Sequence, residues 1–212
     1  MKRLISVLLL LLVTTACAPS QPSVSLSVVE VYATSATQLW LSELYTCADS
    51  LSVTVNISSD APDISIRLSA PADLTTPAFQ IDSEDILIVV NRQSPLGNLT
   101  LEQARTIFSG QGNPAVQVWA YASDTDAQEV FDTVVMNGRS VTSFARLAVS
   151  VGQMSEALNA DVNAVGILPR RSMVGNVHEV FVAATVPVLV ITPSEPQGIV
   201  RDLIACLQKY GD

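Results

Sequence analysis

Small hydroxyl-bearing residues follow the first apolar segment of the chain and offer one way of binding an anion. Residues 28–32 are β-branched and aromatic, which predicts a buried strand, and apolar residues at helical spacing begin soon afterwards. Thr34, Ser35 and Thr37 lie at this junction. Hydroxyl groups and free backbone N–H groups at the start of a helix can together bind an anion. Ser35 and Thr37 could equally do no more than cap the helix, and the sequence leaves both interpretations open.

Residue types that most enzymes need are scarce in this chain. His178 is the only histidine, so a metal site built from histidine and cysteine is nearly excluded, and a surface position is the simpler interpretation. The sequence contains neither a Gly-x-Ser-x-Gly motif nor a glycine-rich phosphate loop. The acidic groups within residues 82–85 and 124–126 could perform acid–base chemistry, but solvated loops or a helix start explain them more simply. The sequence therefore favours a binding protein over an enzyme, and no cofactor is expected.

The chain is acidic, with 20 Asp and Glu against 11 Lys and Arg among 212 residues and a formal net charge of −9. An acidic surface repels nucleic acid, so no nucleic-acid partner is expected. Apolar residues make up 49% of the chain, which argues against disorder and is enough for a sizeable core. We expect a globular body of one domain or two small lobes.

The pattern of residues 1–16 predicts a secretory signal peptide, which would not be part of the fold. A basic start is followed by a short apolar run, well below the roughly 20 residues that a membrane-spanning helix requires. Residues 13–17, Val-Thr-Thr-Ala-Cys, resemble the lipobox of bacterial lipoproteins, with Thr14 where that family usually has Leu. An ordinary signal peptide with an incidental cysteine is the alternative. We expect lipid on Cys17, a Ser- and Pro-rich tether over residues 17–27, and anchoring to the extracytoplasmic face of the cell membrane.

Strand-like and helix-like segments alternate after the tether. Strands are predicted at residues 28–32, 52–57, 63–68, 85–91, 116–121, 164–168, 179–183 and 187–192, and helices at residues 39–47, 101–108, 130–135, 154–158 and 195–210. Thr100, followed three residues later by Gln103, predicts a capping box at the start of the second helix, and Gly110 predicts its end. This alternation predicts an α/β fold with a mostly parallel sheet. Residues 58–62 are too few for a crossover helix between the second and third strands. We therefore expect these two strands to be antiparallel, or the third to do no more than cap a lobe.

A longer stretch resembles the phosphate-binding branch of periplasmic solute-binding proteins. Residues 85–91 form an apolar strand ending in Val-Asn, similar to the family's strand that crosses between two lobes. Residues 98–110, Asn-Leu-Thr-Leu-Glu-Gln-Ala-Arg-Thr-Ile-Phe-Ser-Gly, are similar to the helix that opens its second lobe. Residues 161–168 resemble the family's Pro-Asn-Ala-Ile-Gly-Tyr stretch, and residues 187–206 fit its last strand and closing helix.

The resemblance implies a type 2 periplasmic-binding-protein-like fold, in which two α/β lobes are joined by two crossing strands and hold a small solute between them. Lobe one would contain residues 28–90 and 184–212, and lobe two residues 91–183. The first lobe is shortened, because no helix separates its second and third strands. The implied function is that of a solute-binding component of an ABC importer, with an ABC permease as partner. A non-transport lipoprotein that uses the fold as a structural, sensing or interaction module is the alternative.

The resemblance also implies where the solute binds. Thr34 and Ser35 match a small polar loop of the family's first lobe, with Thr37 next in reach, and Arg67 at the end of the third strand could add a positive charge. Residues Ser123 and Thr125 match the binding loop of lobe two.

The binding loop of lobe two departs from the family pattern in its charge. The arginine that precedes this loop in the family is missing, and Asp124 and Asp126 add two carboxylates. These repel an anion by energies of kcal/mol size at close range. A phosphate-like oxyanion is the family expectation, but these charges argue for a different solute, a cationic solute or a cleft that has lost its ligand.

Cys47 and Cys206 remain once Cys17 is lipidated. In the implied topology the last helix returns to lobe one, so both cysteines lie in the same lobe, and the exported protein reaches a compartment in which disulfides persist. A disulfide is the expected state, and two buried free thiols are the alternative.

Overall fold

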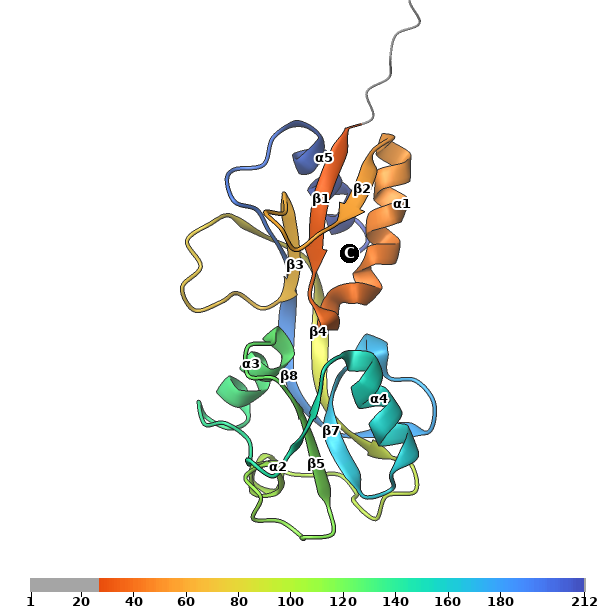
Figure 1. Ribbon diagram of the computed structural model, residues 1–212, viewed down its shortest axis with the longest axis vertical. Helices are drawn as coiled ribbons and strands as arrows, with labels where there is room; N and C mark the ends of the chain where they lie inside the picture. Colours follow the sequence, from red (N-terminus) through yellow and green to blue (C-terminus); the bar gives the residue numbers. More distant parts are fainter. Residues whose placement is uncertain (1–26, 212) are drawn as a thin grey trace, which may run out of the picture.

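The computed structural model describes residues 27–211, which form two lobes stacked along the long axis of the molecule (Figure 1). The strands are β1 (Val28–Ala33), β2 (Thr54–Ile57), β3 (Ile64–Leu68), β4 (Ala78–Asn91), β5 (Gln117–Tyr121), β6 (Arg146–Ala148), β7 (Ala164–Pro169) and β8 (Val177–Ile191). The helices are α1 (Leu41–Leu51), α2 (Leu101–Phe108), α3 (Asp126–Val134), α4 (Val151–Ala160) and α5 (Gly198–Gln208), with short 3-10 helices η1 (Ser35–Trp40) and η2 (Arg170–Ser172). The expected signal peptide and lipid site lie outside the described residues.

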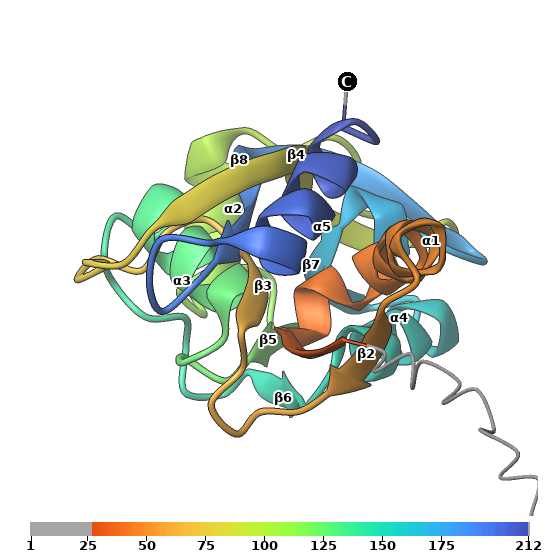
Figure 2. The ribbon, with the colours of Figure 1, turned by 90° about the horizontal axis from the view of Figure 1, so that it is seen from above.

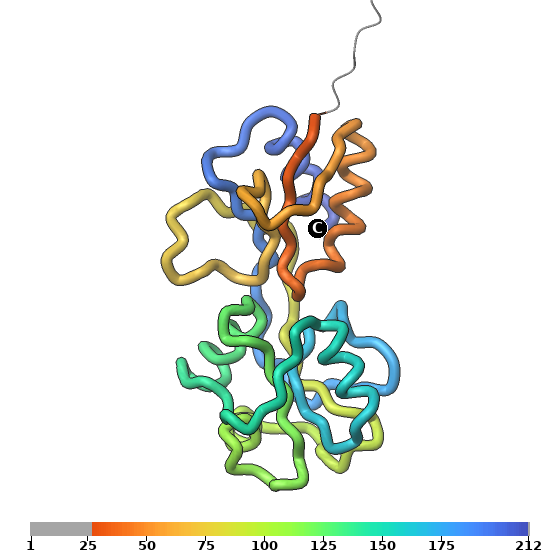
Figure 3. The backbone as a smooth tube through the Cα atoms, viewed as in Figure 1, coloured from red at the N-terminus to blue at the C-terminus, as the bar shows by residue number. Residues whose placement is uncertain are grey.

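The backbone passes between the lobes twice, along β4 and back along β8 (Figure 3). The strand order in the sheet is β2-β1-β3-β8-β4-β7-β5-β6. Strands within each lobe are parallel, but β8 is antiparallel to β3 and β4, and β4 is antiparallel to β7. The α/β prediction is confirmed, and the sheet is mixed instead of mostly parallel because the two crossing strands run in opposite directions. The lobe borders expected at residues 90 and 184 fall inside these two strands.

The connection between β2 and β3 differs from both alternatives that the sequence suggested. Both strands run parallel to β1, on opposite sides of it. β2 ends opposite Val31, and β3 begins opposite the same residue, so the chain crosses β1 while continuing in one direction. Ser58 N donates to Val31 O and Asp63 N donates to Glu30 O, each at 2.9 Å, on either side of this crossing. A helix is needed only when the chain must return to the start of the sheet, and here it does not return.

Strand β8 is a single strand, although the sequence predicted two, at residues 179–183 and 187–192. Pro187 lacks an N–H group, but its carbonyl accepts a 2.8 Å hydrogen bond from Ser69 N, so pairing continues through it. Register shifts along the β4–β8 pair accompany its passage from one lobe to the other. Strand β6 at the edge of the sheet was not predicted, because three residues are too few to show a pattern.

Local signals placed the helix after the first crossing correctly. Thr100 Oγ1 accepts from Gln103 N, and Gln103 Oε1 accepts from Thr100 N, which forms the expected capping box of α2. The apolar face of α2 buries Ala104 and Phe108, and the ring of Phe108 packs on Phe131 of α3. This packing fixes α3, whose first residue lies at the boundary between the lobes.

Helices α1 and α5 lie side by side in the first lobe (Figure 2). Cys47 of α1 and Cys206 of α5 form a disulfide, with their Cα atoms 5.9 Å apart. This bond connects the first helix of the lobe to the last helix of the chain, although 159 positions separate the two cysteines.

Candidate functional site

The candidate site lies where the two lobes meet, at the ends of β1 and β3 and the start of α3 (Figure 1). β1 and β3 are parallel neighbours, so their carboxyl ends lie at the same edge of the sheet. Ligands in open α/β folds commonly bind at this edge. Thr34 directly follows β1, and its N–H donates to Ile66 O of β3 at 3.1 Å. The α/β architecture therefore brings the first polar loop to the boundary between the lobes.

The carboxylate of Asp126 occupies this boundary. Asp126 is the first residue of α3 and is only 3% exposed. Its Oδ2 accepts hydrogen bonds from Thr34 Oγ1 at 2.7 Å and from Leu68 N at 2.8 Å. Its Oδ1 accepts from Ala127 N at 2.9 Å. A residue of the second lobe is thus bound by two donors of the first.

Ser35 and Thr37 have different partners from the ones that the sequence suggested. Ser35 Oγ accepts from Val151 N, the first N–H group of α4 in the opposite lobe, at 3.0 Å, and does not cap the helix that follows it. Thr37 is fully buried and donates to Ile66 O at 2.8 Å, while its hydroxyl also contacts Thr34 Oγ1 at 3.0 Å. Thr34 and Ser35 therefore bond across the boundary, whereas the partners of Thr37 lie within the first lobe.

The loop before α3 contributes less to the boundary than expected. Thr125 Oγ1 donates to Ala122 O of its own loop at 2.9 Å. Asp124 is exposed, and Ser123 lines a pocket between the lobes. Sequence reasoning treated Asp126 as a source of repulsion and missed it as the residue that crosses the boundary. Its place at the start of a helix, after a small polar loop, was the available signal.

Arg67 lies beside the cleft, where its charge is matched by a carboxylate. Its Nη2 contacts Glu129 Oε2 at 2.6 Å, which joins β3 of the first lobe to α3 of the second. The side chain of Arg67 is 19% exposed and that of Glu129 is 44% exposed. The positive charge that could attract an anion is therefore already compensated.

A pocket of about 480 Å³ opens between the lobes next to this ion pair. Its polar lining comprises Ser69 from the first lobe and Ser123, Glu129, Asp132 and Thr133 from the second. None of the described residues that line it is basic. Burial raises the pKa of the Asp132 carboxyl, although Gln128 Nε2 donates to it at 2.8 Å. The lining offers acceptors and negative charge, which suits a cationic or donor group.

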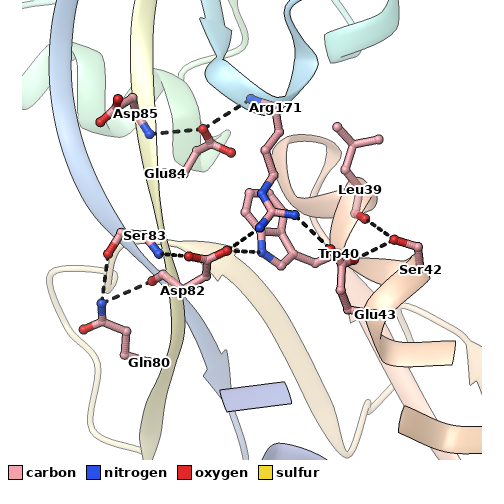
Figure 4. A network of polar contacts seen from close by, with 10 residues as sticks. All are labelled: Leu39, Trp40, Ser42, Glu43, Gln80, Asp82, Ser83, Glu84, Asp85 and Arg171. Carbon is pink, nitrogen blue, oxygen red and sulfur yellow. Dashed lines mark hydrogen bonds and ion pairs between the residues drawn. The ribbon is translucent and has the colours of Figure 1, made fainter. Parts of the chain in front are cut away.

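A second contact between the lobes lies on the side of the crossing strands (Figure 4). Arg171 of η2 donates to Glu43 Oε1 at 2.9 Å and to Asp82 Oδ2, and its guanidinium lies over the ring of Trp40. Trp40 Nε1 donates to the same Asp82 oxygen at 3.2 Å. No local pattern indicated this cluster, because its members come from three parts of the chain that are far apart in sequence.

The part of the chain that the structure describes, residues 27–211, contains neither a metal cluster nor a membrane-spanning helix. In this part of the chain, no group of three or more His, Cys, Asp or Glu side chains could hold a metal ion. No helix in the same range has the length and apolar character to cross a membrane.

Comparison with known proteins identifies the fold. No known family profile matches the chain, and no curated protein does. A Clostridium perfringens protein, assigned as a phosphate ABC transporter substrate-binding protein and solved with bound phosphate, is 15% identical, with a TM-score of 0.73 over 85% of this chain and 93% of that one.

Two regulatory proteins are similar as well. The CcmR regulatory domain from Synechocystis, in complex with 2-PG, is 11% identical with a TM-score of 0.67, over 87% of this chain and 97% of that one. CbnR, a LysR family transcriptional regulator, is 15% identical with a TM-score of 0.59, over 88% and 70%. The chain has a periplasmic-binding-protein-like fold. The expected fold is thus confirmed, and by their names these neighbours are a binding protein and regulators, not enzymes.

Proposed function

We propose that this protein is a lipid-anchored, extracytoplasmic solute-binding protein of an ABC importer, and that its solute is a small molecule with a cationic or hydrogen-bond-donating group. The observation that carries the proposal is the pocket between the lobes, which is lined by Glu129 and Asp132. Pockets of several hundred Å³ at the interface between two lobes are typical sites for small molecules. The Clostridium perfringens protein with this fold supports the transport role by its assignment.

Phosphate is a poor candidate for this pocket. Asp132 lines it and Asp126 lies at the nearby boundary, whereas Arg67 and Glu129 neutralise each other, so no positive charge is left to attract an anion. Charges of the same sign at close range repel by kcal/mol-size energies even with partial screening. An ammonium or amide group of a solute would instead find acceptors in these carboxylates and in the hydroxyl of Ser123.

The lipid anchor is proposed from the sequence and from the position at which β1, the first strand, begins. β1 starts at the end of the first lobe that lies farthest from the second lobe (Figure 1). A tether at residues 17–27 would hold that end toward the membrane, with lipid on Cys17. The two lobes and the pocket between them would then extend away from the point of attachment.

A non-transport role is the second candidate, and one observation favours it. Direct hydrogen bonds already join the lobes, from Thr34 to Asp126 and from Val151 N to Ser35. The ion pairs of Arg67 and Arg171 add to them. A protein closed by its own side chains could serve as a rigid interaction module without a solute.

Thermal unfolding in the presence of candidate solutes separates these functions. A panel of small amines and amino acids is compared with phosphate and sulfate. A bound ligand is detectable in this way, because a ligand at 100 times its Kd adds about 2.7 kcal/mol of stability. We expect an amine-bearing compound to raise Tm, and Asp132→Asn to reduce that rise.

The matched control is Asp202→Asn, which removes an exposed carboxylate from α5 and should leave the rise unchanged. A panel in which no compound raises Tm would favour the interaction module. A Tm rise that survives Asp132→Asn in full would place the solute outside this pocket.

A further inference from the structure

The buried carboxylate of Asp126 is bound in the way in which proteins bind a free anion. Its donors are the hydroxyl of Thr34 after β1, the backbone N–H of Leu68 at the end of β3, and the backbone N–H of Ala127 in the first turn of α3. Strand ends and helix N-termini supply the usual donors for bound oxyanions. Here those donors come from three elements and both lobes, and one side chain of the protein accepts from all of them.

We propose that Asp126 is the specificity-determining residue of the cleft, where its carboxylate substitutes for an oxyanion and thereby keeps phosphate and sulfate out. The inference rests on the proposed function only in taking the boundary between the lobes as the place where small molecules bind. Removal of this one carboxylate converts the boundary into an oxyanion site.

Occupancy and charge both support this role. The carboxylate is 3% exposed and accepts from Thr34 Oγ1 and Leu68 N, so an incoming phosphate has neither the space nor these two donors. The negative charge of Asp126 also acts on its surroundings. Burial, and to a lesser degree the Asp126 carboxylate, raises the pKa of Tyr121. An approaching anion would meet the same repulsion.

Removal of the side chain leaves the donors in place. The N–H groups of Leu68 and Ala127 belong to the backbone of β3 and α3, and the backbone at Thr34 is held by the hydrogen bond from Thr34 N to Ile66 O. The Arg67–Glu129 pair is close to neutral as a unit and remains beside the site. The N–H groups of Leu68 and Ala127 would then lose their side-chain acceptor, the Thr34 hydroxyl would be released from it, and unpaired buried donors favour the binding of an acceptor.

A purely structural role for Asp126 makes a different prediction. If the carboxylate only stabilises the contact between the lobes, its removal lowers stability and confers no affinity for anions. If it substitutes for an oxyanion, its removal creates phosphate affinity that the wild-type protein lacks. The gain of a ligand therefore distinguishes the two roles, whereas a change in stability does not.

The test is titration of inorganic phosphate into the full chain by calorimetry, with Tm as a second measurement. Asp126→Ala and Asp126→Ser are compared with the wild type and with Asp124→Ala. This control removes the same charge from an exposed residue of the same loop. We expect the two Asp126 variants to bind phosphate at least tenfold more tightly than the wild type, with a Tm that rises with phosphate concentration. Asp124→Ala should behave as the wild type does.

Two results would overturn the inference. The first is a folded Asp126 variant that binds phosphate no more tightly than the wild type. The second is a saturable shift of the Leu68 amide signal in NMR spectra of the wild-type protein when phosphate is added. Such a shift would show that phosphate reaches these donors despite Asp126, whereas we expect the signal not to move. Failure here leaves the response to amines untouched, so the two proposals fail separately.

Discussion

The guanidinium group of Arg171 lies over the indole ring of Trp40, 4.5 Å from the ring centroid, and joins the two lobes beside the crossing strands (Figure 4). Glu43 and Asp82 pair with the same guanidinium, so one side chain of the second lobe makes three contacts with the first, two ion pairs and one cation–π contact. Arginine suits this place because its planar group can stack on a ring and donate at its edges at the same time.

Replacement of Arg171 by Ala should lower the free energy of unfolding by about 1–2 kcal/mol. Partly exposed ion pairs contribute roughly 0.2–1 kcal/mol each, and an exposed cation–π contact contributes about 0.5–1 kcal/mol. Urea unfolding measures the change. The control is Arg201→Ala, which removes an exposed arginine paired with the adjacent Asp202 and should change stability by less than about 0.5 kcal/mol. Equal losses in both variants would show that the Arg171 cluster contributes no more than an ordinary surface charge.

Glu84 should make stability depend on pH in one particular direction. It is 3% exposed, and within the described residues its Oε2 has no hydrogen-bond partner. Burial raises its pKa above the usual value, so the folded state holds its proton more firmly than the unfolded state. Its stabilising contribution is complete below the unfolded-state pKa near 4.5 and is lost as pH rises through the raised folded-state pKa. Glu84→Gln should therefore gain stability relative to the wild type as the pH rises above about 4.5.

The neighbouring Asp85 provides a control of opposite sign. Hydrogen bonds from Thr185 and then from Arg170 lower the pKa of Asp85, so its contribution is present above the unfolded-state value of 3.8 and is lost as pH falls. Asp85→Asn should be less stable than the wild type at neutral pH, and the difference should shrink in acid. Unfolding in urea at a series of pH values measures both variants. If the free energy of unfolding of Glu84→Gln changes with pH in the same way as that of the wild type, the pKa of Glu84 is not raised in the folded state.

The Cys47–Cys206 disulfide should contribute strongly to the stability of the first lobe. It closes a loop across 159 positions, and the chain-entropy model gives about 4–5 kcal/mol for a loop of this size. Reduction, or a double change to Ser, should lower the urea midpoint by a corresponding amount. Thiol counting on the denatured, non-reduced protein checks the bond directly. Detection of both thiols of Cys47 and Cys206 would rule the disulfide out.

Mass spectrometry of the membrane fraction tests the proposed anchor. We expect a mature chain that begins at Cys17 and carries lipid on the cysteine sulfur. Two acyl chains on this residue would hold the protein stably on a membrane, whereas one would bind only marginally. Cys17→Ser should move the protein out of the membrane fraction. A Cys17→Ser protein that stays bound to the membrane would contradict the anchor.

The sequence by itself determined the features that depend on neighbouring residues. The alternation of strand and helix patterns predicted the α/β fold, and the Thr100–Gln103 pair predicted where α2 begins. Such signals are readable because the interacting groups are only three or four residues apart and their geometry follows from the helix itself. The small polar loop after β1 was identified in the same way, since its place follows from the end of a strand.

Tertiary structure decided what these residues contact. Strand β3 pairs in parallel with β1 instead of forming an antiparallel pair with β2. The pairing along β1 makes this possible, because β2 ends and β3 begins at the same level of β1. Thr34 meets Asp126 across 92 positions, and Arg171 meets Glu43 across 128. No local pattern encodes contacts of this range, because they depend on how β4 and β8 bring the two lobes together. The same carboxylate that the sequence presents as a repulsive charge in a loop becomes, once the lobes meet, the acceptor between them.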